Sequence, residues 1–168
     1  MKQSDENKGR FRLSEEDYIR FKSIAAPIAH DPRVMRMQEY IQHGQVTTYD
    51  HCIDVARTAF WLNCHFHLGA DEHKLVRAAL LHDYFLYDWH DKGDHLHGYH
   101  HPAIASSNAR EDFELTYAEQ KMIESHMWPL TLFHIPTSRG GWILMLVDKL
   151  CSSGEIINDR YSKISRLF

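Results

Sequence analysis

The sequence predicts an all-α domain, and three observations carry this prediction. Apolar residues recur at intervals of three and four along several long stretches, which is the period of an amphipathic helix. Most of these stretches begin near a Ser, Thr or Asp that can cap a helix and end near a Gly or Pro. No stretch shows the strict alternation of apolar and polar residues that indicates a half-buried strand. We therefore expect a helical bundle of about seven helices.

The expected helices follow one another through short connections. The clearest start is Thr116-Tyr117-Ala118-Glu119, where Thr followed three residues later by Glu forms a capping box. A His-rich stretch with Gly93 and Gly98 precedes Pro102 and indicates a loop. The expected helical spans are residues 14–27, 31–44, 47–69, 71–83, 102–110, 116–127 and 138–152, with a short helical tail after Glu155.

Length and composition indicate one soluble domain. A chain of 168 residues can bury a sizeable core, and its share of hydrophobic residues, 43%, is that of an ordinary globular protein. We expect residues 1–13, which are polar, to form a disordered tail and residues 14–168 to form the domain. The net charge of −4 gives no basic excess for binding a nucleic acid polymer.

The cysteine pattern and the apolar runs suggest where the protein resides. Cys52, Cys64 and Cys151 are odd in number and form no CxxC pair, which favours a reducing, cytoplasmic setting over a disulfide framework. Residues 1–10 lack the apolar core of a signal peptide. The longest apolar run, Trp142 to Val147, is too short to span a bilayer, so no membrane partner is expected.

The strongest functional feature is a set of histidines and aspartates in apolar helical context. His82-Asp83 ends a buried helical stretch, and burying both side chains is costly unless something compensates their polarity. A cation would do so with ligands from elsewhere in the chain, and Asp148, inside the most hydrophobic segment, is an equally costly residue to bury. The candidates in chain order are His51, His82, Asp83, His101, His126 and Asp148.

This ordered set resembles the HD-domain superfamily of metal-dependent phosphohydrolases. The resemblance rests on five stretches that together span residues 47–152: Asp50 to Ala56, Ala79 to Asp83, His101 to Ala105, Ile123 to His126, and Val147 to Lys149. The chain differs from the HD-GYP subgroup, because Tyr84-Phe85 follows the doublet and no Gly-Tyr-Pro follows His126. Cyclic dinucleotide hydrolysis is therefore not expected.

The resemblance implies a single-domain HD-type bundle with a dinuclear metal site. His51, His82, Asp83 and Asp148 would hold one divalent ion, and Asp83 would bridge to a second ion held also by His101 and His126. Nitrogen and oxygen ligands suit Fe, Mn, Ni, Zn or Mg without choosing among them. A metal-bridging hydroxide would then attack the phosphorus of a small phosphate ester, for which a nucleotide is one candidate.

One metal ligand and the substrate contacts have alternative assignments. His100 could replace His101, although His101 matches the family's His-Pro helix start. Lys149 is a candidate catalytic residue and phosphate contact, and His97, Lys92 and Arg139 are candidate substrate contacts. A protein with one metal would not need His101 or His126, whose side chains could then be ordinary helix-end histidines.

Two other functions use the same residues. Some HD-fold enzymes use this ligand set in a mixed-valent diiron centre for oxygen chemistry, and a non-catalytic module could keep the metal pocket to bind a ligand. Because fold does not fix substrate, the sequence leaves open the substrate, the metal, the number of ions and the oligomeric state.

Overall fold

The computed structural model describes residues 11–88 and 96–165, with side chains through residue 159. Within these residues it confirms the all-α prediction, with seven α-helices and one small two-stranded hairpin. The elements are α1 (Glu15–Ala29), α2 (Pro32–Met35), the 3-10 helix η1 (Arg36–Glu39), β1 (Ile41–His43), β2 (Val46–Thr47), α3 (Thr48–His65), α4 (Glu72–Leu81), α5 (His97–Phe113), α6 (Tyr117–Ser125) and α7 (Arg139–Ser165).

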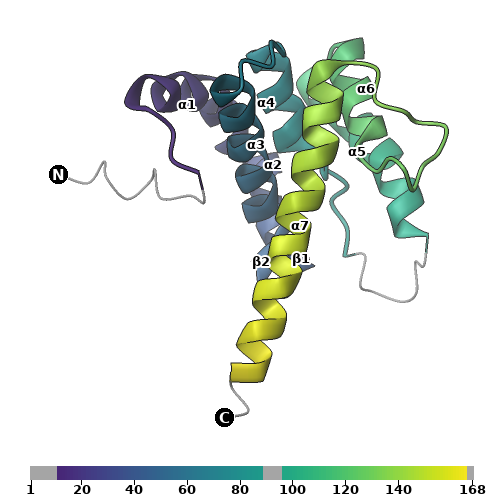
Figure 1. Cartoon of the computed structure of the whole chain (residues 1–168). Coiled ribbons are helices and arrows are strands. Elements are labelled where there is room, and N and C mark those ends of the chain that lie inside the picture. Colours follow the sequence, from purple (N-terminus) through teal and green to yellow (C-terminus); the bar gives the residue numbers. More distant parts are fainter. Residues whose placement is uncertain (1–10, 89–95, 166–168) are drawn as a thin grey trace.

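Helix α4 forms the centre of the bundle. It contacts α1, α3, α5, α6 and α7, and Figure 1 shows it between α1 on one side and α5 and α6 on the other. The side chains of its last turn, Ala78 to Leu81, are all buried, so this end of the helix presents apolar groups in every direction. A helical segment that is apolar all round belongs in a core. His82 and Asp83, which follow Leu81, therefore lie in the middle of the domain.

The expected disordered tail lies mostly outside the described residues, which begin at residue 11. The two apolar residues at its end pack against the domain. Leu13 is buried, and the ring of Phe11 stacks on Trp61 with ring centroids 4.3 Å apart. Packing against the bundle therefore begins before Ser14, whose side chain caps α1 by accepting a hydrogen bond from the Asp17 backbone.

The helix expected over residues 31–44 is wrong beyond Glu39. Asp31 caps α2 and Pro32 occupies its first turn, as expected, but η1 follows at once and the chain then forms the hairpin. Ile41 pairs with Thr47 and His43 with Val46 in antiparallel register. Gly44 makes the turn with a positive φ of 62°, which a residue without a side chain adopts easily.

Other boundaries also differ from the prediction, and three of them lie at a proline or at an expected gap. Helix α1 continues through Pro27 to Ala29, and α5 begins at His97 with Pro102 inside it. A proline inside a helix loses one hydrogen bond and crowds the carbonyl four residues earlier, and tertiary packing can outweigh this cost. Helix α7 runs unbroken through the expected gap between residues 152 and 155 and extends beyond the rest of the bundle (Figure 1).

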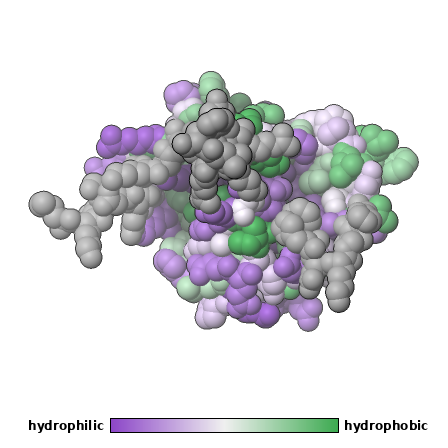
Figure 2. All heavy atoms as spheres, turned by 90° about the horizontal axis from the view of Figure 1, so that it is seen from below, coloured by the Kyte–Doolittle hydropathy of each residue, from purple (hydrophilic) through white to green (hydrophobic). Residues whose placement is uncertain are grey.

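The connection between α6 and α7 exposes apolar side chains. Leu132 is 65% exposed and Phe133 97% exposed. On the face drawn in Figure 2, hydrophilic and hydrophobic side chains are mixed, and a group of hydrophobic ones lies at the edge on the side where Figure 1 shows this connection. Within the described residues, no helix combines the length and the hydropathy that crossing a membrane requires.

Candidate metal centre

Five helical elements bring six buried His and Asp side chains together at the end of α4. His51 lies in the second turn of α3 and faces inward with Val55 and Ala59, which follow at intervals of four. His82 caps the C-terminus of α4, and His126 caps that of α6. All six candidate ligands from the sequence are buried: His51, His82, Asp83, His101, His126 and Asp148.

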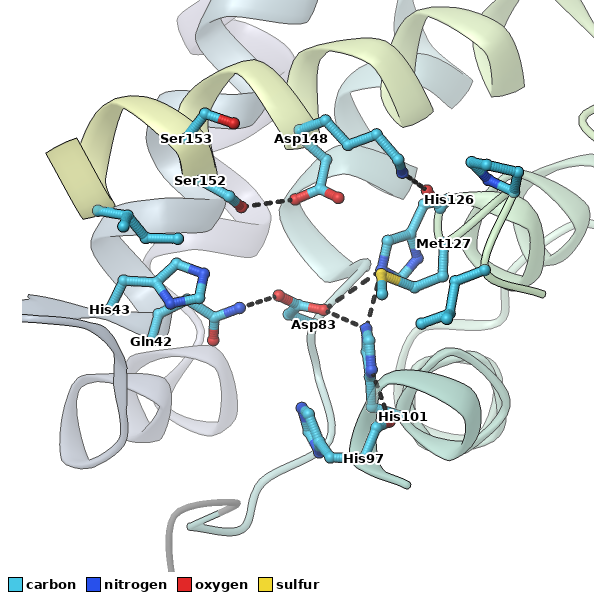
Figure 3. A pocket seen from close by; sticks show the side chains of 14 residues that line it. Gln42, His43, Asp83, His97, His101, His126, Met127, Asp148, Ser152 and Ser153 are labelled. Atoms are coloured by element: carbon cyan, nitrogen blue, oxygen red, sulfur yellow. Dashed lines mark hydrogen bonds and ion pairs between the residues drawn. The ribbon is translucent and has the colours of Figure 1, made fainter. Parts of the chain in front are cut away.

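Asp83 lies between two clusters and directs one carboxylate oxygen toward each. Its Oδ2 atom is 3.5 Å from His82 Nε2 and 4.0 Å from His51 Nε2. Its Oδ1 atom is 3.2 Å from His101 Nε2 and 3.6 Å from His126 Nε2 (Figure 3). The carboxylate is therefore placed to serve two groups of ligands at once.

The first cluster consists of His51, His82 and Asp148, and the second of His101 and His126. In the first, Asp148 Oδ1 lies 3.2 Å from His51 Nε2 and 3.6 Å from His82 Nε2. In the second, the two Nε2 atoms are 2.9 Å apart. The two nitrogens are close enough that both could bind one cation, since metal–nitrogen distances are about 2.0–2.1 Å for zinc.

The outer nitrogens of all four imidazoles are occupied, which fixes their tautomers. Nδ1 of His82, His101 and His126 lies 2.7, 2.9 and 2.7 Å from the backbone oxygens of Ala79, His97 and Ile123. Nδ1 of His51 lies 2.8 Å from Glu155 Oε1. Because these oxygens only accept hydrogen bonds, each Nδ1 carries a proton, and Nε2 is the nitrogen left to face a cation, the arrangement typical of metal-binding histidine.

The charges of this centre are strongly coupled. Burial disfavours the charged form of Asp83, but His82 and His101 outweigh this and hold its pKa far below the ordinary value. Burial likewise opposes a charge on His51, yet hydrogen bonds to Asp148 and Glu155 raise its pKa to about 10. Burial, with the neighbouring His101 and His82, lowers the pKa of His126 to about 3. Positive charge is thus favoured at His51, beside two carboxylates, and disfavoured at His126.

The residues present fit a pair of cations. His82 Nε2 and Asp83 Oδ1 are buried and make no hydrogen bond within the residues that the structure describes. Their lone pairs would be costly to bury unless a cation accepted them. Two sets of three ligand atoms, each set within 4.8 Å, satisfy the spacing of a metal site: His51, His82 and Asp148, and His82, Asp83 and His126. His101 extends the second set through its contacts with Asp83 and His126.

A protein-family model described as HD domain matches residues 48–152, more than half of the chain. The chain belongs to the HD domain family. No curated protein and no solved structure matches the chain significantly. The family match confirms the predicted resemblance, while the exclusion of the HD-GYP subgroup stays a prediction.

The candidate metal centre, formed by the two clusters and Asp83, opens into a cavity of about 600 Å³. Asp83, His101, His126 and Asp148 form its inner end. Its remaining wall is largely apolar and includes Met127, Pro129, Leu130 and Ile156. A pocket with an apolar wall and a few convergent polar groups is the usual form of a small-molecule site.

The other candidates from the sequence have different outcomes. His101 is buried and His100 is exposed, so the structure places His101 at the centre. His97 lines the cavity, stacks on His101 at 4.6 Å and contacts the Tyr87 hydroxyl at 2.8 Å. Lys92 lies outside the described residues.

The two basic candidates on α7 lie in different places. Lys149 lines the cavity and donates to the His126 carbonyl at 2.9 Å, and its burial lowers its pKa. Arg139 is not among the described residues that line the cavity, and its Nη1 donates to the Leu68 carbonyl at 3.2 Å, so a role in substrate binding stays a prediction. Arg139 opens α7 more than two turns before Asp148, which separates it from the centre.

Two residues of the site were missed by the sequence reasoning. Gln42 Nε2 donates to Asp83 Oδ2 at 2.6 Å (Figure 3), and Glu155 accepts from His51. Gln42 lies in the hairpin, where the sequence predicts a helix, and Glu155 lies inside α7, where the sequence predicts the start of a separate tail. The spacing of Asp148 and Glu155, seven residues apart on one helix, is the signal that could have placed both on one face.

Proposed function

We propose that this HD domain is a metal-dependent phosphohydrolase that hydrolyses a small phosphate ester at a dinuclear site. The observation that carries the proposal is the Asp83 carboxylate, with one oxygen toward each of two histidine-containing clusters beside a cavity large enough for a small substrate. A carboxylate is suited to this place because it can offer an oxygen to each of two cations.

The residues would divide between two divalent ions. His51, His82, Asp148 and Asp83 Oδ2 would hold the first, and Asp83 Oδ1, His101 and His126 the second. When bound, such a pair supplies Lewis-acid stabilisation of phosphoryl oxygens and makes water a stronger nucleophile at neutral pH. Fe, Mn, Ni, Zn and Mg are the candidates, since mixed nitrogen and oxygen ligands suit several of them.

The chain itself would position the ester and exclude water. Lys149 Nζ, half-buried at the cavity wall, is placed to bind a phosphate oxygen by a charge-assisted hydrogen bond. The imidazole of His97, held by Tyr87, is a further polar contact on the side of the second cluster. Met127, Leu130 and Ile156 would contact the ester's alcohol part, since they form the apolar wall.

The net charge and the cysteines bear on the ligand and on the cellular compartment. We propose a small phosphorylated molecule as the partner and no nucleic acid polymer, given the net charge of −4. Cys52, Cys64 and Cys151 are all free thiols, which supports the reducing, cytoplasmic setting expected from the sequence.

The direct test is phosphate release. The full chain, loaded in turn with Mn²⁺, Fe²⁺, Zn²⁺, Ni²⁺ or Mg²⁺, is assayed against a panel of phosphate monoesters that includes nucleotides. We expect turnover of at least one ester and none by the Asp83→Ala variant. Absence of release with every metal, while a control phosphatase is active on the same panel, would contradict the proposal.

Two other functions remain testable with the same protein. The ligand set also suits a diiron oxygenase, which would require about two iron atoms per chain and a mixed-valent electron paramagnetic resonance signal. A non-catalytic module would bind a phosphorylated ligand tightly without turnover. The cavity would let a substrate reach both clusters, and the Lys149 ammonium at its wall favours a phosphate ester as that substrate.

A further inference from the structure

Two residues outside the family match contact the candidate ligands from opposite ends of the chain. Gln42 precedes the matched region, residues 48–152, and Glu155 follows it. Gln42 contacts Asp83, and Glu155 contacts His51. We infer that Gln42 and Glu155 are positioning residues that hold the ligands of the first metal ion and set its affinity. This inference rests on the proposed dinuclear site.

The side-chain amide of Gln42 contacts both Asp83 and helix α3. Its side chain is buried, and Nε2 donates to Asp83 Oδ2 at 2.6 Å. A carboxylate oxygen can only accept, so the amide nitrogen must face Asp83 and the amide oxygen must face away. That oxygen accepts from the Thr48 hydroxyl at 3.2 Å, and Thr48 lies one turn before His51 on α3. The amide therefore ties the bridging carboxylate to the helix that carries His51.

Glu155 holds the other side of the His51 ring. Its Oε1 atom accepts from His51 Nδ1 at 2.8 Å, while Asp148 Oδ1 lies 3.2 Å from His51 Nε2. Asp148 and Glu155 are two turns apart on α7, so one helix face contacts both ring nitrogens. A carboxylate partner at Nδ1 orients a metal-binding imidazole and increases the basicity of its free nitrogen. The other three imidazoles have backbone oxygens in this position.

The hairpin and the second half of α7 hold each other in place. Strand β1 contacts α7, and the Gly44 turn lies so close that a side chain there would meet Asp159 at 2.7 Å. Gly44 also has a positive φ of 62°. Both features favour glycine, and together they hold the hairpin that presents Gln42 against the helix that presents Glu155.

Both contacts act on the first metal position. Gln42 binds the Asp83 oxygen that faces the first cluster, and Glu155 binds a member of that cluster. The second cluster is oriented by the carbonyls of His97 and Ile123. Loss of a partner that orients a ligand typically weakens metal affinity about 10–100-fold. We therefore expect loss of affinity at the first position and little change at the second.

The experiment measures Mn²⁺ binding to the full chain by calorimetry and electron paramagnetic resonance. Gln42→Leu and Glu155→Ala are compared with Gln38→Leu and Asn158→Ala, which make matched changes at exposed positions nearby. We expect wild type and controls to bind two ions with a spin-coupled signal. Each test variant should bind one ion normally and the other about 10–100-fold more weakly, with an uncoupled signal at one equivalent.

Conservative variants separate positioning from folding. Glu155→Gln retains an oxygen that can accept from His51 Nδ1, so it should lose less affinity than Glu155→Ala. Thr48→Ser retains the hydroxyl and should bind as wild type does. Thermal melting of the metal-free variants reports folding, and Gln42→Asn, which is too short to reach Asp83, replaces Gln42→Leu if that variant does not fold.

Each outcome bears on a distinct claim. If both test variants bind two ions as tightly as the controls, the inference is overturned and the proposed function is untouched. If only one is weakened, the role of the other residue is overturned. If wild type binds no ion, both are overturned. If the variants weaken as expected but wild type hydrolyses no phosphate ester, the inference stands and the proposed function fails.

Discussion

The two halves of the candidate metal centre are built in different ways. The second cluster takes both histidines from α5 and the end of α6, and each is oriented by a carbonyl three or four residues earlier in its own helix. The first cluster joins His51 to Asp148, which are 97 residues apart, and His51 is oriented by a side chain still farther away. Only His82 of that cluster has a local carbonyl partner.

The difference separates local from remote control of ligand geometry. A histidine held by its own helix keeps its orientation wherever that helix forms, because the carbonyl and the ring move together. A histidine that is held by a remote carboxylate keeps its orientation only when the whole bundle is assembled. We therefore expect the second position to tolerate distant substitutions, whereas the first should be sensitive to the hairpin and to the C-terminal half of α7.

The largest effect is expected from Asp83, where the two halves meet. Asp83→Ala removes the oxygens that face both clusters, so both ions should be lost together. Elemental analysis of protein purified without chelators measures this loss directly. Retention of one full equivalent of metal would show that Asp83 is not shared and that the two halves are independent sites.

A smaller loss is expected from His126, which belongs to the second cluster alone. His126→Ala should remove mainly one ion and leave the other bound, because the first cluster keeps all its members. His100→Ala provides the matched control, since His100 is exposed. Equal metal content in both variants would refute the assignment of His126 as a ligand.

Lys149 should affect catalysis without affecting metal content. Lys149→Met removes a charged donor at the cavity wall, and hydrogen bonds to charged groups contribute about 1.5–3 kcal/mol. The expected fall in kcat/KM is about 10–100-fold. Arg139→Met, on the same helix but away from the cavity, should change kcat/KM little, so an equal fall in both variants would count against a phosphate contact at Lys149.

The smallest effect is expected from the cap of α6, the helix that ends at His126. Thr116 and Glu119 form a reciprocal capping box, and removing a cap costs about 1 kcal/mol. Thr116→Ala should lower the free energy of urea unfolding by about that amount and leave metal content unchanged. Loss of an ion in this variant would show that the orientation of His126 depends on more than the carbonyl in its own helix.

Most of the centre could be predicted from the sequence because its ligands lie on locally encoded helices. His82-Asp83 ends an apolar helix, His126 ends a capped one, and Asp148 lies where a carboxylate is costly to bury. The capping box of α6 was confirmed because its signal spans only four residues.

The hairpin and the remote partners could not be predicted in this way. Val34, Met37 and Ile41 recur at helical spacing, so the hairpin residues were assigned to a helix, and the turn at Gly44 was taken for its end. Gln42 could not then be placed near Asp83. Glu155 and His51 are 104 residues apart, and the spacing of Glu155 from Asp148 places Glu155 near His51 only if one helix runs unbroken through residues 152–155.

The number of ions bound to the wild-type chain tests the central claim most directly. Elemental analysis of protein purified without chelators, with the Asp83→Ala variant alongside, should give about two divalent ions per wild-type chain and none in the variant. One ion in wild type, or equal metal content in the two proteins, would contradict a dinuclear centre bridged by Asp83.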